Sequence, residues 1–256
     1  MQLGGSVRNR PETLISTIMF FPRLSLLALV LSGAIVANAN PATISPIVAP
    51  DFILAEADGL VTGEAENFVR QEHTTVRAWH RISNSTTPVV EPDGDPSHAD
   101  SASGHAYVEC LPDTRRTHDD PLSPRENFSN EPGTMAVLSY RIHFSTPGRY
   151  YVWLRTFSTT TEDNGAHIGL NGTWPESGLR WQTTQKHAWS WDCRQRTNEV
   201  HVGVPMQLWI DVPSAGEHTF QISMREDGLE IDQWLLAKDI AYRPEGAIKP
   251  SKRVNR

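Results

Sequence analysis

The sequence lacks the motifs that would assign a reaction directly. It contains no G-x-S-x-G nucleophile elbow, no H-E-x-x-H zinc motif and no glycine-rich phosphate loop. It also has no basic tract, and its formal net charge of −7 argues against nucleic acid and anionic lipid as partners. Its ten histidines show no tight metal-ligand spacing. Carboxylate-based glycosidase chemistry stays open, because such pairs converge in space and not in sequence.

Cysteine is scarce. Only Cys110 and Cys193 are present. In an exported protein the two could pair, and the bridge would close a long loop worth about 4–5 kcal/mol in the chain-entropy model. The alternative is two buried free thiols. The sequence leaves both possibilities open, since it gives no distance between the two residues.

Long apolar runs are absent apart from residues 24–36. Arg23 precedes this run and an A-x-A sequence ending at Ala39 follows it, which predicts a secretory signal peptide over residues 1–39. Translation could also start at Met19. The run is too short to span a bilayer comfortably, although a membrane anchor is the alternative. We therefore expect a secreted or periplasmic protein with no other membrane segment.

The remainder has the length of one domain. Residues 40–59 are rich in proline, alanine and isoleucine without a clear period, and we interpret them as a linker or N-terminal arm. Residues 60–243 form the predicted domain, and residues 244–256 form a C-terminal tail. Loss of residues 1–39, which carry three arginines and one glutamate, would make the acidic net charge more negative by two.

No segment shows a helical period over three turns, and short runs of β-branched and aromatic residues recur instead. They predict strands at residues 76–82, 105–111, 135–144, 150–156, 166–170, 207–212, 218–224 and 230–237. The turns at residues 145–148 and 213–216 each predict an antiparallel hairpin. This pattern predicts an all-β fold, a two-sheet antiparallel β-sandwich or jelly roll.

Four of the eight tryptophans lie close together in a polar stretch, at Trp174, Trp181, Trp189 and Trp191, interleaved with basic residues such as Arg180. Indole faces can stack on pyranose rings, and forked arginine donors can hold hydroxyls or carboxylates. The alternative for each ring is a place in the core. We take the first three tryptophans and the arginine as candidate sugar contacts, and the fourth tryptophan stays ambiguous.

Polar residues in nearby turns extend the candidate site. Asp163 and Asn164 precede a strand, Glu176 follows the first tryptophan of the stretch, and Arg225 could bind a uronate or sulfate ester. Hairpin chemistry is the alternative for these turns, because Asn-Gly tolerates positive φ. Glu176 with Asp227 could instead act as the acid and base of a glycosidase.

Four motifs follow one another along the chain: E-A-E at residues 64–66, P-G-R-Y-Y-V-W-L-R at residues 147–155, A-G-E-H-T-F at residues 215–220 and I-D-Q-W-L-L at residues 231–236. Their order resembles carbohydrate-binding modules of families 6 and 35, which have a galactose-binding-like β-sandwich. Residues 64–79 are also similar to a β-sandwich module at the C-terminal end of some bacterial xylan glucuronidases.

The resemblance implies a structural Ca2+ ion between the first and last strands, held by Glu64, Glu66 and Asp232 together with backbone oxygens. It also implies a ligand site on loops at one end of the sandwich, beside a polar residue two positions before Asp232. That residue is commonly asparagine, and here it is Glu230. The departure leaves open whether Glu230 accepts hydrogen bonds from sugar hydroxyls or joins the metal site.

Together these features predict a calcium-stabilised, non-catalytic carbohydrate-binding module. We expect its ligand to be a plant or algal polysaccharide or oligosaccharide, and a catalytic partner chain could supply the activity. Two alternatives remain: a polysaccharide-degrading glycosidase or lyase that uses loop carboxylates, and a structural or adhesive surface module. Fold alone does not decide between them.

Overall fold

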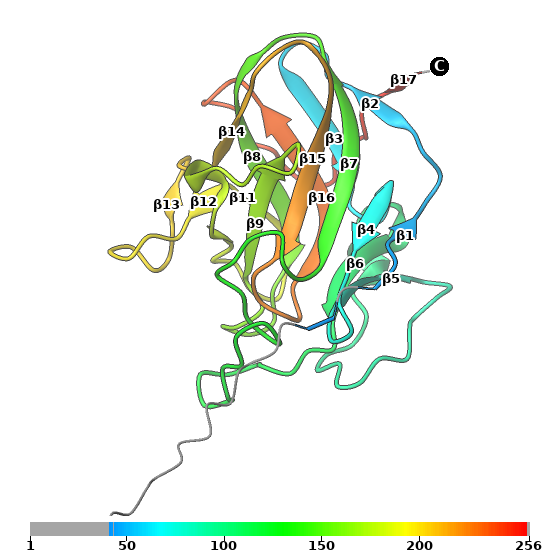
Figure 1. Ribbon diagram of the computed structural model, residues 1–256, viewed down its shortest axis with the longest axis vertical. Helices are drawn as coiled ribbons and strands as arrows, with labels where there is room; N and C mark the ends of the chain where they lie inside the picture. Colours follow the sequence, from blue (N-terminus) through cyan, green and yellow to red (C-terminus); the bar gives the residue numbers. More distant parts are fainter. Residues whose placement is uncertain (1–40, 43, 255–256) are drawn as a thin grey trace, which may run out of the picture. The chain divides into compact units, whose positions relative to one another are not determined.

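Strands dominate the part of the chain that the structure, a computed structural model, describes: residues 41–42 and 44–254 (Figure 1). They form two sheets around an apolar core, so the predicted all-β sandwich is confirmed. The predicted signal peptide, residues 1–39, lies outside the described residues. Within the described ranges, no helix has the length and apolarity that crossing a membrane requires.

The larger sheet has ten strands. Eight follow one another in space in the order β1 (Ile47–Val48), β4 (Arg70–Glu72), β7 (Val137–Phe144), β15 (Gly216–Met224), β9 (Gly165–Leu170), β10 (Trp181–Gln182), β12 (Arg194–Gln195) and β13 (Val204–Pro205). The short strand β2 (Ile53–Ala55) pairs with β7 in parallel and with β17 (Arg253–Val254) in antiparallel fashion. The predicted arm and the predicted C-terminal tail therefore both contribute strands.

The smaller sheet has seven strands. Five follow the order β11 (Ser190–Asp192), β8 (Gly148–Phe157), β16 (Glu230–Ala237), β6 (Ala106–Leu111) and β5 (Ala78–Ser83). Two more strands flank them, β14 (Trp209–Val212) on β8 and β3 (Leu60–Glu64) on β16. Three 3-10 helices, η1 (Ala99–Ser101), η2 (Ser103–His105) and η3 (Glu176–Gly178), lie in the connections.

Alternation along the strands separates the core from two outer faces. On β7, Leu138 and Tyr140 belong to the core, while Ser139 lies on the opposite side of the sheet. On β6, Val108 belongs to the core, and its neighbour Glu109 lies on the other face. Each sheet thus has an outer face that can carry polar side chains.

Successive long strands alternate between the sheets, and this overturns two sequence predictions. The hairpins predicted at residues 145–148 and 213–216 are wrong, because β7 and β8 lie in different sheets, as do β14 and β15. At the first turn, the Glu56 carboxylate accepts hydrogen bonds from the backbone N–H groups of Ser145 (2.8 Å) and Thr146 (3.2 Å). Turn residues specify a reversal of direction, but they do not specify the partner of the next strand.

Cys110 and Cys193 are buried free thiols, so the structure shows no disulfide between them. Cys110 lies on β6 and Cys193 follows β11, with β8 and β16 between those strands. Three inter-strand steps amount to about 14 Å, which is beyond the Cα separation that a disulfide allows. The Cys193 thiol instead donates a hydrogen bond to the carbonyl of Leu208 (3.3 Å).

Candidate functional site

The tryptophan-rich stretch does not form a single aromatic platform. Trp181 is fully buried, and its indole N–H donates to the carbonyl of Asp192 (2.9 Å). Its predicted stacking role is therefore wrong, because no face of the ring reaches solvent. Trp174 is half-buried on the larger sheet, where it packs so closely on Gly169 that a Cβ would meet the ring at 2.7 Å. Trp189, also half-buried, reaches the smaller sheet instead.

Other predicted sugar contacts pair with one another or with nearby loop residues. Arg225 is buried and forms an ion pair with buried Glu226, so it is not a surface donor for uronate or sulfate. Asn164 is buried as well, and its side-chain amide donates to the carbonyl of Thr161 (2.9 Å). Glu176 and Arg180 form an ion pair of 3.2 Å in the segment around η3. Among the described residues, the hydrogen-bond, ring and cation–π partners of Trp189 are His98, Tyr107, Phe157 and Arg155, and none of these four predicted contacts is among them.

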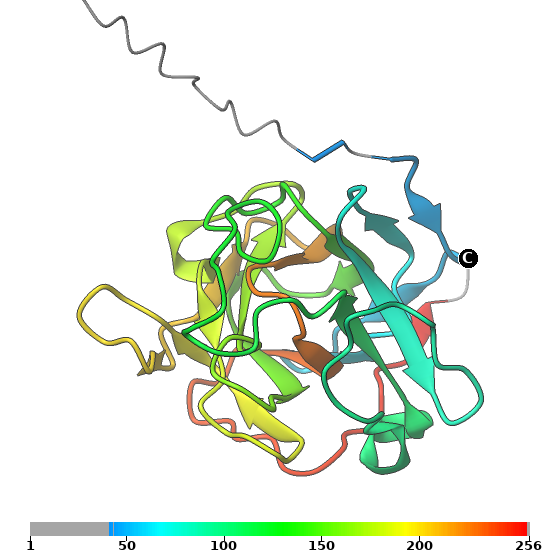
Figure 2. The same cartoon turned by 90° about the horizontal axis from the view of Figure 1, so that it is seen from below.

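Buried carboxylates gather instead on the outer face of the smaller sheet. Glu230 on β16 stands directly opposite Glu109 on β6, and the two residues are 1% and 2% exposed. The loop of residues 84–98 brings Asp93 and Asp95 to them. Asp163 lies in the connection between β8 and β9, and its charge acts on both Glu109 and Glu230. Figure 2 views the sandwich from below, from the end at which β8 leads into this connection. We call these five residues the acidic cluster.

The acidic cluster is electrostatically unfavourable by itself. Burial, followed by repulsion from Asp93 and Asp95, raises the pKa of Glu109 to about 9. Burial and the charge of Glu109 raise the pKa of Glu230 well above its usual value. Like charges directly opposite each other destabilise a sheet, and buried charges without partners cost more still. Protons or bound cations would remove this repulsion.

An aromatic wall borders the acidic cluster. The ring of His98 stacks on Phe157 with a centroid distance of 3.6 Å, and its Nδ1 lies 2.8 Å from Glu230 Oε1. Trp189 packs edge-on against Phe157 and Tyr107, at 5.5 and 5.3 Å, and its indole N–H donates to the carbonyl of His98 (3.3 Å). Burial lowers the pKa of His98, which favours the neutral imidazole.

Sequence reasoning identified two members of the acidic cluster, Asp163 and Glu230, and missed the other three as well as His98. One signal was available: Glu109 is the only charged residue in an apolar strand, A-Y-V-E-C-L. A charge that must be buried points to a partner or a ligand. Asp93 and Asp95 occur in a polar, proline-rich loop, where nothing local distinguishes them from solvated acids.

The residues implied for a structural calcium ion lie together at the end of β3 and on β16. Glu64 Oε2 and Glu66 Oε2 are buried without a hydrogen-bond partner. Burial, then the charges of Glu64 and Asp232, raises the pKa of Glu66 to about 8. Asp232 already pairs with Arg155 and accepts the backbone N–H of Ser103 (2.8 Å). The two unpartnered oxygens fit a hard cation, whereas Asp232 would have to share its lone pairs.

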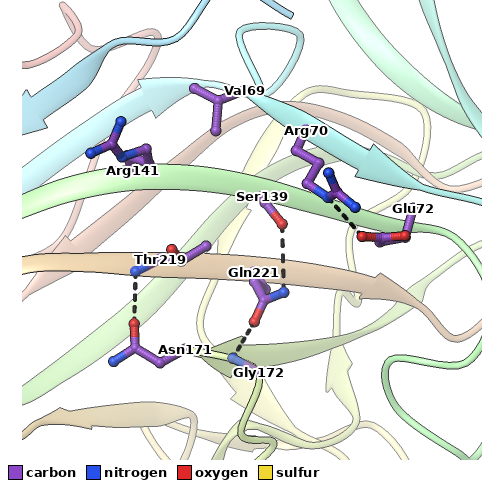
Figure 3. A pocket seen from close by; sticks show the side chains of 9 residues that line it. All are labelled: Val69, Arg70, Glu72, Ser139, Arg141, Asn171, Gly172, Thr219 and Gln221. Atoms are coloured by element: carbon purple, nitrogen blue, oxygen red, sulfur yellow. Dashed lines mark hydrogen bonds and ion pairs between the residues drawn. The ribbon is translucent and has the colours of Figure 1, made fainter. Parts of the chain in front are cut away.

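A second candidate surface lies on the outer face of the larger sheet (Figure 3). It is a groove of about 470 Å³ that crosses β4, β7 and β15 and ends at a turn. Its polar groups bind one another: Gln221 Oε1 accepts the N–H of Gly172 (2.6 Å), and Asn171 Oδ1 accepts the N–H of Thr219 (2.8 Å). None of the residues that line this groove is aromatic.

No family model matches the sequence. A protein of Formosa agariphila called "Uncharacterized protein P23" is 52% identical over 200 residues, covering 78% of this chain and 48% of that protein. The chain thus spans about half the length of this relative.

The chain is also similar to solved structures, at greater distance. The GH26-CBM35 β-(1,4)-mannanase of Podospora anserina is 19% identical and has a TM-score of 0.34. The aligned region covers 73% of this chain and 29% of the mannanase chain. A family 35 carbohydrate-binding module from Clostridium thermocellum is 13% identical and has a TM-score of 0.32. The aligned region covers 69% of this chain and 96% of the module. Carbohydrate-active proteins are therefore among the neighbours, but scores this low assign no ligand or residue role to this chain.

Proposed function

We propose that this chain is a secreted or periplasmic carbohydrate-binding module without catalytic activity, and that its binding site lies where Trp189 borders the acidic cluster. The observation that carries the proposal is a partly exposed indole fixed beside a cluster of buried carboxylates. Arg155 lies over the indole ring at 5.6 Å, and Phe157 packs against its side. A pre-oriented ring of this kind suits the C–H-rich face of a pyranose, and neighbouring carboxylates can accept its hydroxyl hydrogens.

The proposed ligand is a plant or algal polysaccharide or one of its oligosaccharides. A catalytic partner chain is part of the same proposal. We also propose a structural calcium ion at Glu64 and Glu66 with Asp232. Removing calcium should then lower the melting temperature of the wild type and leave that of the Glu64→Gln/Glu66→Gln variant unchanged.

Matched tryptophan substitutions test the binding site. Glycan microarrays and affinity-gel electrophoresis would compare the wild type with Trp189→Ala and Trp174→Ala, after thermal melts confirm that both variants fold. We expect Trp189→Ala to lose binding and Trp174→Ala to retain it, because only Trp189 adjoins the acidic cluster. Loss in Trp174→Ala alone would move the site to the larger sheet. A wild type that binds no glycan would favour an adhesive or structural module.

Polysaccharide cleavage is a second candidate function, favoured by one observation. Glu109, whose pKa is raised to about 9, stands directly opposite a second buried carboxyl, that of Glu230. A carboxyl that stays protonated at neutral pH can serve as the general acid of a glycosidase. Release of oligosaccharides by the wild type and not by Glu109→Gln would establish cleavage and contradict the non-catalytic proposal.

A further inference from the structure

Five side chains on the outer face of the smaller sheet form two triads of potential metal ligands. In the first triad, one ligand atom each of Asp95, His98 and Glu230 lies within 4.8 Å of the others. The second triad contains Asp93, Asp95 and Glu109 and meets the same limit. Asp95 belongs to both, so the two triads are adjacent and share one carboxylate. Such sharing is the arrangement by which two-metal sites hold their ions about 3.5–4 Å apart.

Unpartnered side chains point to a missing ligand. Glu109 is 2% exposed and has no hydrogen-bond or ion-pair partner among the described residues. Asp93 Oδ1 is likewise buried without a partner. Buried polar groups are almost always paired in folded proteins, so two unpartnered groups in one triad need a specific cause. A cation between them supplies the partner that both lack.

The charge balance indicates how many cations the triads can accept. Together they contain four carboxylates, and no lysine or arginine among the described residues forms an ion pair with any of the four. The charge of Arg116 acts on Asp93, but its guanidinium forms its ion pair with Asp113 (3.5 Å). Two divalent cations would neutralise four carboxylates.

His98 is fixed in the orientation that a metal ligand needs. Its ring stacks on Phe157, its backbone N–H donates to the Tyr107 hydroxyl (3.3 Å), and its carbonyl accepts from Trp189. The Thr159 hydroxyl donates a hydrogen bond to the Asp95 carboxylate. In metal sites, hydrogen bonds of this kind from residues behind the ligands hold the carboxylates in position. An imidazole beside carboxylates suits manganese or zinc better than calcium.

We propose that Asp93, Asp95, His98, Glu109 and Glu230 form a two-cation centre in which Asp95 bridges both ions. Mn2+ suits both triads, because it accepts imidazole and carboxylate ligands. This centre is separate from the calcium residues near β3 and does not depend on saccharide binding. Each triad supplies only three protein ligands, which leaves positions on each ion for oxygen atoms of water or of a bound molecule.

Manganese binding to the EDTA-treated, dialysed protein tests this proposal without any saccharide. Isothermal titration and metal analysis after gel filtration should give two Mn2+ ions per chain. Electron paramagnetic resonance should show a spin-coupled pair, which is the signature of a bridging ligand. Asp95→Asn should weaken binding at least tenfold and abolish the coupling. The proposal is overturned if the wild type binds no stoichiometric manganese, or if the wild-type ions are uncoupled.

Control variants separate this centre from general acidity and from misfolding. Asp211→Asn removes an exposed acid on β14 that pairs with Arg149, and should leave stoichiometry and coupling unchanged. Glu64→Gln/Glu66→Gln should also preserve the coupled signal. If Asp95→Asn fails to fold, Glu109→Gln replaces it and should reduce the stoichiometry to one. A variant that folds and keeps two coupled ions would contradict the assigned ligands.

Discussion

The outer faces of the two sheets handle polar groups in opposite ways. On the larger sheet, the groove in Figure 3 is lined by polar groups that bind one another, such as the Gln221 side chain and the backbone N–H of Gly172. On the smaller sheet, Glu109 and Glu230 are buried face to face, and the charge of Glu109 raises the pKa of Glu230. The polar groups of the groove are satisfied by hydrogen bonds within the chain. The acidic cluster needs protons or a bound ligand to remove the repulsion between its carboxylates. The second region is therefore the stronger functional candidate.

The largest expected difference between the two faces is their response to cations. At manganese concentrations 100 times the dissociation constant, each occupied site should raise the free energy of unfolding by about 2.7 kcal/mol. Urea unfolding of the EDTA-treated protein with and without Mn2+ measures this. Asp95→Asn should remove most of the gain, while Glu72→Gln in the groove should keep it. Equal gains in both variants would show that the ions bind elsewhere.

His167, on β9 of the larger sheet, allows a comparison of the two sheets by pH titration. Unlike the acidic cluster, its ring is buried with both nitrogen atoms hydrogen-bonded. Its Nε2 lies 2.9 Å from the carbonyl of Ser129, and its Nδ1 accepts the backbone N–H of Arg180 (3.1 Å). Both bonds are made by the neutral ring. Burial, and then the charges of Arg225 and Arg180, lowers the pKa of His167 to about 4.

Between about pH 6.5 and pH 4 the unfolded chain therefore binds a proton at His167 that the folded chain does not. The free energy of unfolding should therefore decrease as the pH is lowered through this window, by up to roughly 3 kcal/mol from this residue. Urea unfolding at several pH values would show a shallower decline in His167→Gln, whose amide can also donate and accept. Parallel declines in the two proteins would mean that another group carries the effect.

The smallest expected effects come from the groove. Glu72→Gln breaks only an exposed ion pair with Arg70 (2.7 Å), and should change the free energy of unfolding by less than about 1 kcal/mol. Gln221→Ala should change saccharide affinity by less than twofold, measured by affinity-gel electrophoresis beside Trp189→Ala. A tenfold loss in Gln221→Ala would reverse the comparison and place the ligand on the larger sheet.

The strands were largely predictable, and their partners were not. All eight predicted strands coincide with observed ones, because alternating β-branched and aromatic residues form a local signal. The hairpins failed at residues 145–148 and 213–216 because pairing depends on contacts far along the chain. Short strands such as β10 and β12 lie outside those eight because two residues carry no period.

The candidate site was predictable only in part. Trp189, Asp163 and Glu230 were identified and lie in one region, whereas Trp181 and Arg225 proved to be buried. Residue type alone could not separate the buried residues from the exposed ones, because tryptophan and arginine occur both in protein cores and at binding surfaces. The structural metal set at Glu64, Glu66 and Asp232 stays a prediction.

The sequence by itself determined an all-β chain with polar loops and an aromatic-rich stretch, because period-two patterning and turn residues act over a few positions. Only the tertiary structure decided that the tryptophans separate between two sheets and a core. It also decided that Glu109 and Glu230 meet across neighbouring strands, under a loop that carries Asp95. Their repulsion arises from burial and proximity, and neither quantity exists until the sheets assemble.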